Sequence, residues 1–214
     1  LDDNIRKVLS ALGESGQGGE TTVLSISDHG EMLGNHGFWT KSLMYEDSVG
    51  IPLIMAGPGI RAGTNETPVS LTDIAATVET AVGSVPRPPK ENWAGRPLQA
   101  FVDKPEPSRV ILSEYHDGGS PTGIFMLRSG RWKYVLYAGG HPPQLFDLET
   151  DPHELADLGS SAEHAKIRRD IQTTLHDILD PESVNAQAFA DQARVLAQLG
   201  GREAILALPS FGHT

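Results

Sequence analysis

The period of the hydrophobic positions changes along the chain. Four apolar residues near the start recur at spacings of three, one and three, which predicts an amphipathic helix over residues 2–13. The β-branched and apolar run 21–27 predicts a buried strand, and the short run 51–55 predicts a second strand. A helix, a strand and then a polar loop containing glycine are typical of α/β proteins.

A second helix is predicted from Ser70 onward, because Ser70 and Asp73 have the spacing of a capping box and apolar residues then recur every fourth position. From Gly83 to Pro107 the chain is rich in proline, which predicts an irregular surface connection rather than a helix or strand.

The second half of the chain has a different pattern. Consecutive strands without helices between them are predicted, with a hairpin turn at Ser129-Gly130, and they indicate a small antiparallel sheet. The predicted strands cover 110–115, 123–128, 132–137 and 145–148. Helices follow, one with its apolar face at 167–178 and one that begins at Asp180-Pro181. The last helix has a narrow apolar stripe, for which packing within its own domain is favoured over packing on a partner subunit.

These patterns predict an α/β fold in two parts. Residues 1–107 would form part of a large mixed sheet flanked by helices, and residues 108–214 a small antiparallel sheet with helices at its carboxyl end.

Composition narrows the function classes. The 214 residues carry 17 Lys and Arg against 28 Asp and Glu, a formal net charge of −11, which argues against a nucleic-acid-binding protein. No apolar run approaches the about 20 residues of a membrane span. The absence of Cys excludes disulfides and a cysteine nucleophile within these residues. The sequence is compatible with a cytoplasmic or a periplasmic location.

Asp28 and His29 follow the predicted strand 21–27, at the end where α/β sheets bind ligands. A carboxylate beside an imidazole suits a divalent cation such as Ca²⁺, Mn²⁺ or Zn²⁺, and Gly30 lets the backbone turn away. Two ligands do not complete a metal site, so others must come from elsewhere. The alternative, equally weighted on these two residues alone, is that Asp28 caps a turn and His29 is an ordinary surface side chain.

His36 and Lys41 stand in the same loop. Together with a cation they suit an anionic tetrahedral group such as sulfate or phosphate, because Lys41 can neutralise charge on its oxygens and His36 can donate a hydrogen bond or a proton to the leaving oxygen. Taken singly, a lysine is more often a solvated surface residue and a histidine is more often structural.

The run 27–59, SDHGEMLGNHGFWTKSLMYEDSVGIPLIMAGPG, resembles the second metal-binding segment of type I sulfatases in the alkaline phosphatase superfamily, with choline-sulfatases and phosphonate monoester hydrolases among the nearest branches. The later segments SLTDIAATVETAVG and LFDLETDPHELADL also resemble that family, so the likeness extends over nearly the whole chain. Asn35 stands where the family usually has an acid, and Gly50 where it usually has Arg.

This resemblance implies an alkaline-phosphatase-like fold and the hydrolysis of a small-molecule sulfate ester, or alternatively a phosphonate ester. It implies that Asp28 and His29 ligate one divalent metal, with Ca²⁺ placed before Mn²⁺ and Zn²⁺. It further implies that Lys41 contacts the sulfate oxygens and the leaving group, and that His36 is the family's second histidine.

The family nucleophile is a formylglycine made from Cys or Ser in a C/S-x-P-x-R motif, which this chain lacks. Ser84-Val85-Pro86-Arg87 places the arginine one position early. We therefore expect the chain to be the carboxy-terminal part of a sulfatase, inactive alone; the other expectation is a non-catalytic module that binds an anion or a complementary chain.

Two residues in the second half are candidates for substrate binding. His116 and Tyr115 stand at the end of the predicted strand 110–115 and could line a pocket, although solvation or ordinary packing explains such residues more often. We also expect a homo-oligomer, formed through the carboxy-terminal helices, and no membrane or nucleic-acid partner.

Overall fold

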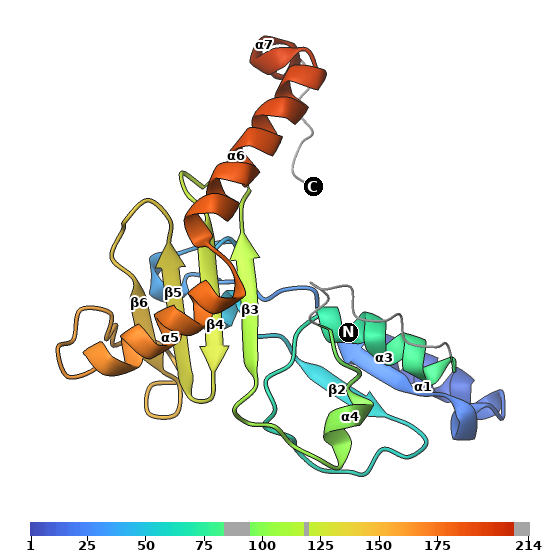
Figure 1. Cartoon of the computed structure of the whole chain (residues 1–214). Coiled ribbons are helices and arrows are strands. Elements are labelled where there is room, and N and C mark those ends of the chain that lie inside the picture. Colours follow the sequence, from blue (N-terminus) through green and yellow to red (C-terminus); the bar gives the residue numbers. More distant parts are fainter. Residues whose placement is uncertain (84–94, 118–119, 208–214) are drawn as a thin grey trace. The chain divides into compact units, whose positions relative to one another are not determined.

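The computed structural model describes residues 1–83, 95–117 and 120–207 (Figure 1). The chain divides into two compact units, Leu1–Ile111 and Leu112–Thr214, which are described separately below. The near-miss motif Ser84-Val85-Pro86-Arg87 lies outside the described residues. No helix in the described part of the chain is both long enough and apolar enough to span a bilayer.

Unit 1 contains the helices and strands expected from the first half of the sequence, with short helical turns between them. Its helices are α1 (Asp2–Glu14), α2 (Glu46–Val49), α3 (Thr72–Ala81) and α4 (Gln99–Val102), with 3-10 turns at Gly18–Glu20 and Asn35–Gly37. Its strands are β1 (Val23–Ile26) and β2 (Leu53–Ala56). Helix α4 lies within the proline-rich segment, which is therefore not irregular throughout.

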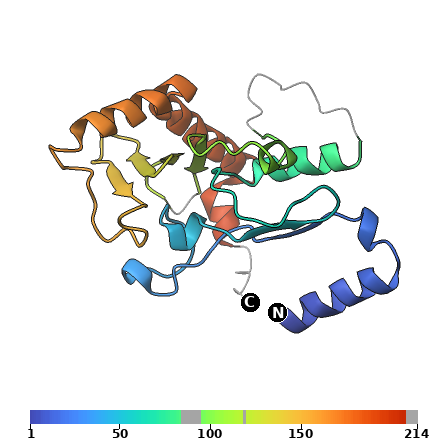
Figure 2. The ribbon, with the colours of Figure 1, turned by 90° about the horizontal axis from the view of Figure 1, so that it is seen from below.

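Strands β1 and β2 form an antiparallel ribbon, with Val23 opposite Ala56 and Ile26 opposite Leu53. Helices α1 and α3 lie on opposite sides of this ribbon (Figure 2). The expectation of a buried first strand is wrong for these residues, because β1 is half-exposed and Ile26 is exposed. The reason is that β1 has β2 as its one strand partner among the described residues, and that α1 has no buried residue with which to cover it.

The buried carboxylate of Asp73 holds the far end of unit 1 together. Arg109 donates to it with both terminal nitrogens, at 2.7 and 2.8 Å, and the backbone N–H of Arg96 donates at 2.7 Å. The backbone N–H of Ser70 also donates to Asp73, at 2.9 Å, which is the bond that the capping-box spacing predicts. Because the charge is fully paired, its burial is tolerated.

Unit 2 is built on the predicted antiparallel sheet. The strands β3 (Val110–Tyr115, which begins just before the unit boundary), β4 (Ile124–Ser129), β5 (Trp132–Tyr137) and β6 (Gln144–Asp147) neighbour one another in chain order. Ser129 pairs with Trp132, so the two-residue turn is Gly130-Arg131 and not Ser129-Gly130. Gly130 takes the left-handed backbone conformation, φ 57°, that such a turn requires and that glycine adopts without strain.

In the described residues the sheet is followed by the helices α5 (Ala165–Ile178), α6 (Pro181–Gln198) and α7 (Gly201–Leu206). Helix α5 contacts β4 and β5 and buries Ile171 and Leu175. Helix α6 begins as predicted, with the Asp180 side chain accepting the backbone N–H of Glu182. The stripe along α6 is half-buried at Val184 and exposed toward its far end.

Candidate active site

The candidate residues of unit 1 lie in the segment after β1, residues 28–41, which we call the site loop. Three hydrogen bonds attach this loop to α2. The N–H of Gly30 donates to the Ser48 carbonyl at 2.8 Å, the buried Ser48 hydroxyl donates to the Lys41 carbonyl at 2.5 Å, and the Asn35 amide donates to Asp47 at 2.9 Å. Both ends and the middle of the loop are therefore fixed to one short helix.

Gly30 is needed for this attachment. A Cβ atom at this position would lie 2.0 Å from the carbonyl oxygen of Asp47, so a larger residue cannot occupy it without moving the backbone. Its backbone is not left-handed, so the glycine allows a close approach rather than the turn expected from the sequence.

The middle of the site loop closes on itself. The N–H of Met32 donates to the Thr40 carbonyl at 3.0 Å, and Met32 is completely buried. Leu33, His36 and Thr40 have φ values of 48°, 53° and 74°, a conformation uncommon for residues other than glycine and strained for a β-branched side chain. Strained backbone of this kind clusters at functional sites in proteins.

Three of the candidate side chains meet. Lys41 Nζ lies 2.6 Å from His29 Nε2, and Asp28 Oδ2 lies 3.4 Å from the same nitrogen. His29 Nδ1 lies 2.7 Å from the Gly30 carbonyl oxygen, which can only accept, so Nδ1 carries the proton. Nε2 is then an acceptor whose lone pair faces the Lys41 ammonium.

The surroundings of Asp28 favour the ionised form of its carboxyl group. A hydrogen bond from its own backbone N–H outweighs the opposing effect of desolvation and, with the N–H of His29 and the charge of Lys41, holds the pKa of Asp28 below the ordinary value of an aspartate. Its side chain is 82% exposed and that of His29 37% exposed, so both are accessible to an ion.

His36 is placed differently. Its ring stacks on Tyr45, with centroids 4.0 Å apart and planes 9° from parallel. The structure therefore groups Asp28, His29 and Lys41 around one nitrogen and gives His36 an aromatic partner. Trp39, in the same loop, is 69% exposed.

The two candidates of unit 2 have partners of their own. His116 Nε2 lies 3.1 Å from a Glu114 carboxylate oxygen, and its ring meets Phe125 edge-on. The Tyr115 hydroxyl donates to Asp117 at 3.2 Å. The buried Nδ1 of His116 has no hydrogen-bond partner among the described residues.

The sequence pattern does not indicate Ser48 and Asp47, whose hydrogen bonds hold the site loop. A serine in a four-residue polar helix carries no periodic signal, and its partner Lys41 lies seven positions away in another element. Among the described residues, no three His, Cys, Asp or Glu side chains come close enough together to hold a metal ion. Asp28 and His29 could therefore supply only part of a ligand set.

Comparison with known proteins shows which family this chain resembles. The Sulfatase family model matches residues 1–84, which include the whole site loop. Choline-sulfatase of Rhizobium meliloti (strain 1021) is 34% identical over 198 residues, or 91% of this chain. The chain belongs to the type I sulfatase family.

Two further proteins are similar to this chain. Arylsulfatase K of Mus musculus is 37% identical over 179 residues, 78% of this chain and 32% of the mouse protein. The crystal structure of the phosphonate monoester hydrolase of Agrobacterium radiobacter superposes with a TM-score of 0.67 at 27% identity, covering 83% of this chain and 38% of that one. The predicted α/β, alkaline-phosphatase-like fold is thus confirmed as that of the sulfatases.

The chain spans 38% of the choline-sulfatase and about as small a share of the other relatives. The activity of a whole sulfatase is therefore a proposal for this protein.

Proposed function

We propose that this chain contributes metal ligands and an anion-contacting lysine to a metal-dependent hydrolase of sulfuric esters. The observation that carries this proposal is the meeting of Asp28 and Lys41 at one nitrogen of His29. A carboxylate, an imidazole and an ammonium group at one point match the charges needed to bind a cation and an anionic ester side by side.

The residues present fit a divalent metal. With Nδ1 bound to a backbone carbonyl, His29 offers its Nε2 lone pair in the way that metal-bound histidines do. Asp28 Oδ2 and His29 Nε2 lie 3.4 Å apart, so both atoms would reach the same cation. We propose Ca²⁺ first, with Mn²⁺ and Zn²⁺ as alternatives; when bound, the metal would supply positive charge to the ester oxygens.

Lys41 and a cation compete for the same lone pair. The ammonium group donates to His29 Nε2, so a metal held by this nitrogen would leave Lys41 to another acceptor. An oxygen of a sulfate ester is such an acceptor, and its developing negative charge in the transition state is stabilised by the lysine. His36, beside Tyr45, would donate a proton to the leaving oxygen as the sulfur–oxygen bond breaks.

The nucleophile must come from outside these residues, because the chain has no Cys and no C/S-x-P-x-R motif. The resemblance to type I sulfatases implies that this nucleophile is a formylglycine. The experiment that tests the proposal is a rate measurement on the purified active enzyme with an aryl sulfate, with and without added Ca²⁺. No sulfate hydrolysis under any divalent metal would contradict it.

A phosphonate monoester or phosphodiester hydrolase is the second candidate, favoured by the similarity to the Agrobacterium radiobacter enzyme. Sulfate and phosphonate esters both present anionic tetrahedral oxygens, so Lys41 suits either. Rates on an aryl sulfate and an aryl phosphonate ester, measured side by side, separate them. A sulfate rate far below the phosphonate rate favours this second candidate.

A third reading belongs to another class: the chain acts alone as a non-catalytic module. Calcium titration of the purified chain distinguishes it from the enzyme, because two ligands bind a cation weakly and a complete site binds it tightly. The intact mass of the polypeptide decides whether the cell makes more than these 214 residues.

We also propose that His116 and Tyr115 contact the substrate. A further proposal is that the protein forms a homo-oligomer. The exposed apolar residues Val195 and Leu199 near the end of α6 support assembly through these helices. The molar mass in solution, measured by light scattering, tests it, and a monomer at high concentration would contradict it.

A further inference from the structure

His36 combines an unusual backbone conformation with an aromatic contact. Its φ and ψ angles are 53° and 15°, in the left-handed region that residues other than glycine rarely adopt. Its imidazole stacks on the phenol ring of Tyr45, with centroids 4.0 Å apart and planes 9° from parallel. A left-handed histidine costs free energy that its surroundings must offset, and residues of this kind cluster at functional sites. The stack on Tyr45 is a contact that offsets part of this cost.

The turn that carries His36 is fixed on both sides. The N–H of Asn35 donates to the Met32 carbonyl at 2.8 Å, and the N–H of Phe38 donates to the Asn35 carbonyl at 3.0 Å. The Asn35 amide also donates to the Asp47 carboxylate at 2.9 Å. These bonds fix the backbone of the turn, so the direction of the imidazole depends on the contacts of the ring itself.

Tyr45 is well placed to direct that ring, because it is the residue at which α2 begins. Its carbonyl accepts the N–H groups of Ser48 and Val49, both at 2.9 Å, and its side chain, like that of His36, is half-buried. The Ser48 hydroxyl in the same turn of helix donates to the Lys41 carbonyl. One short helix therefore fixes both the backbone of the lysine and the ring of the histidine.

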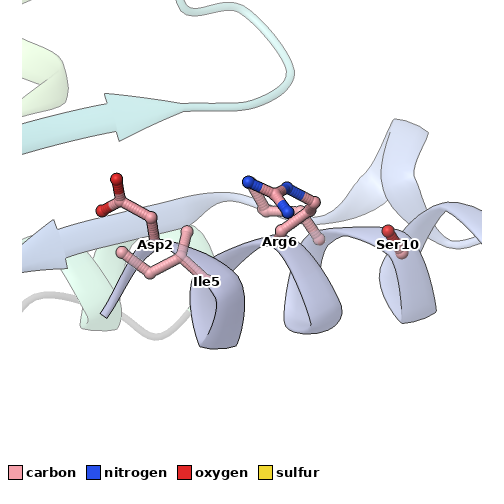
Figure 3. Close-up of a pocket in the computed structure, with 5 residues that line it drawn as sticks. Asp2, Ile5, Arg6 and Ser10 are labelled. Atoms are coloured by element: carbon pink, nitrogen blue, oxygen red, sulfur yellow. The ribbon is translucent and has the colours of Figure 1, made fainter.

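A hollow of about 440 Å³ in unit 1 does not contribute to this arrangement. It runs along α1, and Figure 3 shows residues that line it, projecting from one side of that helix. The lining residues are Asp2, Ile5, Arg6, Leu9 and Ser10. Because all five belong to α1, the hollow is separate from the site loop, and its shape does not direct the ring of His36.

We propose that Tyr45 is the positioning residue that orients His36 toward the leaving group of the ester. This rests on the proposed function, in which His36 protonates the leaving oxygen. As the sulfur–oxygen bond breaks, the sulfuryl group passes to the nucleophile and the bonding electron pair stays on the leaving oxygen. That oxygen takes a proton from protonated His36, which is left neutral. The stack holds the imidazole in one orientation, so its N–H is already directed when the ester binds.

Two esters with different leaving groups test this positioning. Nitrophenolate leaves without a proton more readily than phenolate, so phenyl sulfate depends more on a proton donor than para-nitrophenyl sulfate does. The quantity measured on the active enzyme is the ratio of kcat/KM for para-nitrophenyl sulfate to kcat/KM for phenyl sulfate. Tyr45→Leu should raise this ratio about tenfold or more, because a misdirected acid slows chiefly the poorer leaving group. Tyr45→Phe keeps the ring and should leave the ratio unchanged.

Two further variants separate positioning from folding. Tyr137→Leu is the matched control, because Tyr137 is also half-buried but lies on β5 in unit 2, and it should leave the ratio unchanged. His36→Asn removes the proton donor and keeps a residue that tolerates the left-handed conformation. It should raise the ratio by itself. Since Tyr45 acts through His36, adding Tyr45→Leu to His36→Asn should raise the ratio no further.

Several outcomes would overturn the proposal. An equal loss on both esters in Tyr45→Leu would show that Tyr45 serves only the fold, and a further rise of the ratio in the double variant would show that it does not act through His36. A ratio unchanged in His36→Asn would do the same without any substitution at Tyr45. An unaltered enzyme that hydrolyses neither sulfate nor phosphonate esters would overturn the proposed function and this proposal with it. An active enzyme whose ratio does not respond to Tyr45→Leu would overturn the positioning alone.

Discussion

Lys41 Nζ donates to His29 Nε2 across 2.6 Å, although the two residues are twelve positions apart. The bond exists because the site loop is fixed to α2 at both of its ends. The backbone of Lys41 is held by Ser48, and the backbone next to His29 is held through Gly30. Main-chain contacts therefore position Lys41, and its ammonium group, which carries three donors, keeps two of them for a ligand while it donates to His29.

Replacing Lys41 by alanine should lower kcat of the active enzyme by about 10²–10³-fold, the loss typical of a group that stabilises charge in the transition state. Thermal unfolding should change little, because the side chain is exposed. Lys166→Ala, which removes an exposed ammonium paired with Asp170, is the control. Near-full activity of the Lys41 variant would remove this residue from the mechanism.

Gly30→Ala should destabilise unit 1 by about 2 kcal/mol or more, because the added carbon would lie 2.0 Å from the Asp47 carbonyl and force the backbone apart. Gly63→Ala is the matched control, since a Cβ there meets nothing within 4 Å. Thermal unfolding of both variants measures the difference. Equal unfolding temperatures would show that the site loop is not held against α2 as described.

Ser48→Ala should cost about 1–3 kcal/mol, because the Lys41 carbonyl loses a buried donor. Ser15→Ala removes an exposed hydroxyl that donates to a backbone carbonyl at 2.7 Å and should cost less than about 0.5 kcal/mol. If Ser48 also positions Lys41, substrate affinity should weaken in the active enzyme. A Ser48 variant as stable as the Ser15 variant would show that the hydrogen bond from Ser48 to the Lys41 carbonyl does not hold the site loop.

Lys133 and Glu154 form a buried ion pair in unit 2, 2.7 Å apart, with side chains 0% and 1% exposed. Glu154→Gln should destabilise the unit by about 3–5 kcal/mol, since the lysine charge stays buried without its counter-charge. The double variant Lys133→Met with Glu154→Leu should lose much less. Denaturant unfolding measures both, with the exposed Glu163→Gln as control. A single variant no worse than the double one would refute the argument.

Asp147 makes unit 2 sensitive to acid. Hydrogen bonds from the Arg131 side chain hold the pKa of Asp147 below its ordinary value. The unfolded carboxyl, with a pKa of about 3.9, then takes up its proton before the folded one does, so this stability is full at neutral pH and is lost as pH falls below about 4. Arg131→Gln should flatten this acid dependence, and Arg202→Gln should not. Identical acid unfolding curves for the two variants would contradict it.

Much of the fold follows from local patterns. The stripe of residues 2–13, the hairpin of β4 and β5, and the Asp180-Pro181 helix start each depend on residues within a few positions of one another. Such patterns act through backbone geometry and capping, which tertiary contacts rarely overrule when the pattern is strong. The site residues Asp28, His29 and Lys41 could also be proposed from the sequence, because a carboxylate, an imidazole and an ammonium group in one loop suit the binding of a cation and an anionic ester.

The sequence alone determined the elements and the residue types of the site; the tertiary structure decided which of them meet. In the tertiary structure Lys41 donates to His29 and the ring of His36 stacks on Tyr45. The Ser48 hydroxyl donates to the Lys41 carbonyl, and β1 is half-exposed. The physical reason is that these contacts link separate elements through loops, whose left-handed residues and main-chain hydrogen bonds have no period that a sequence displays.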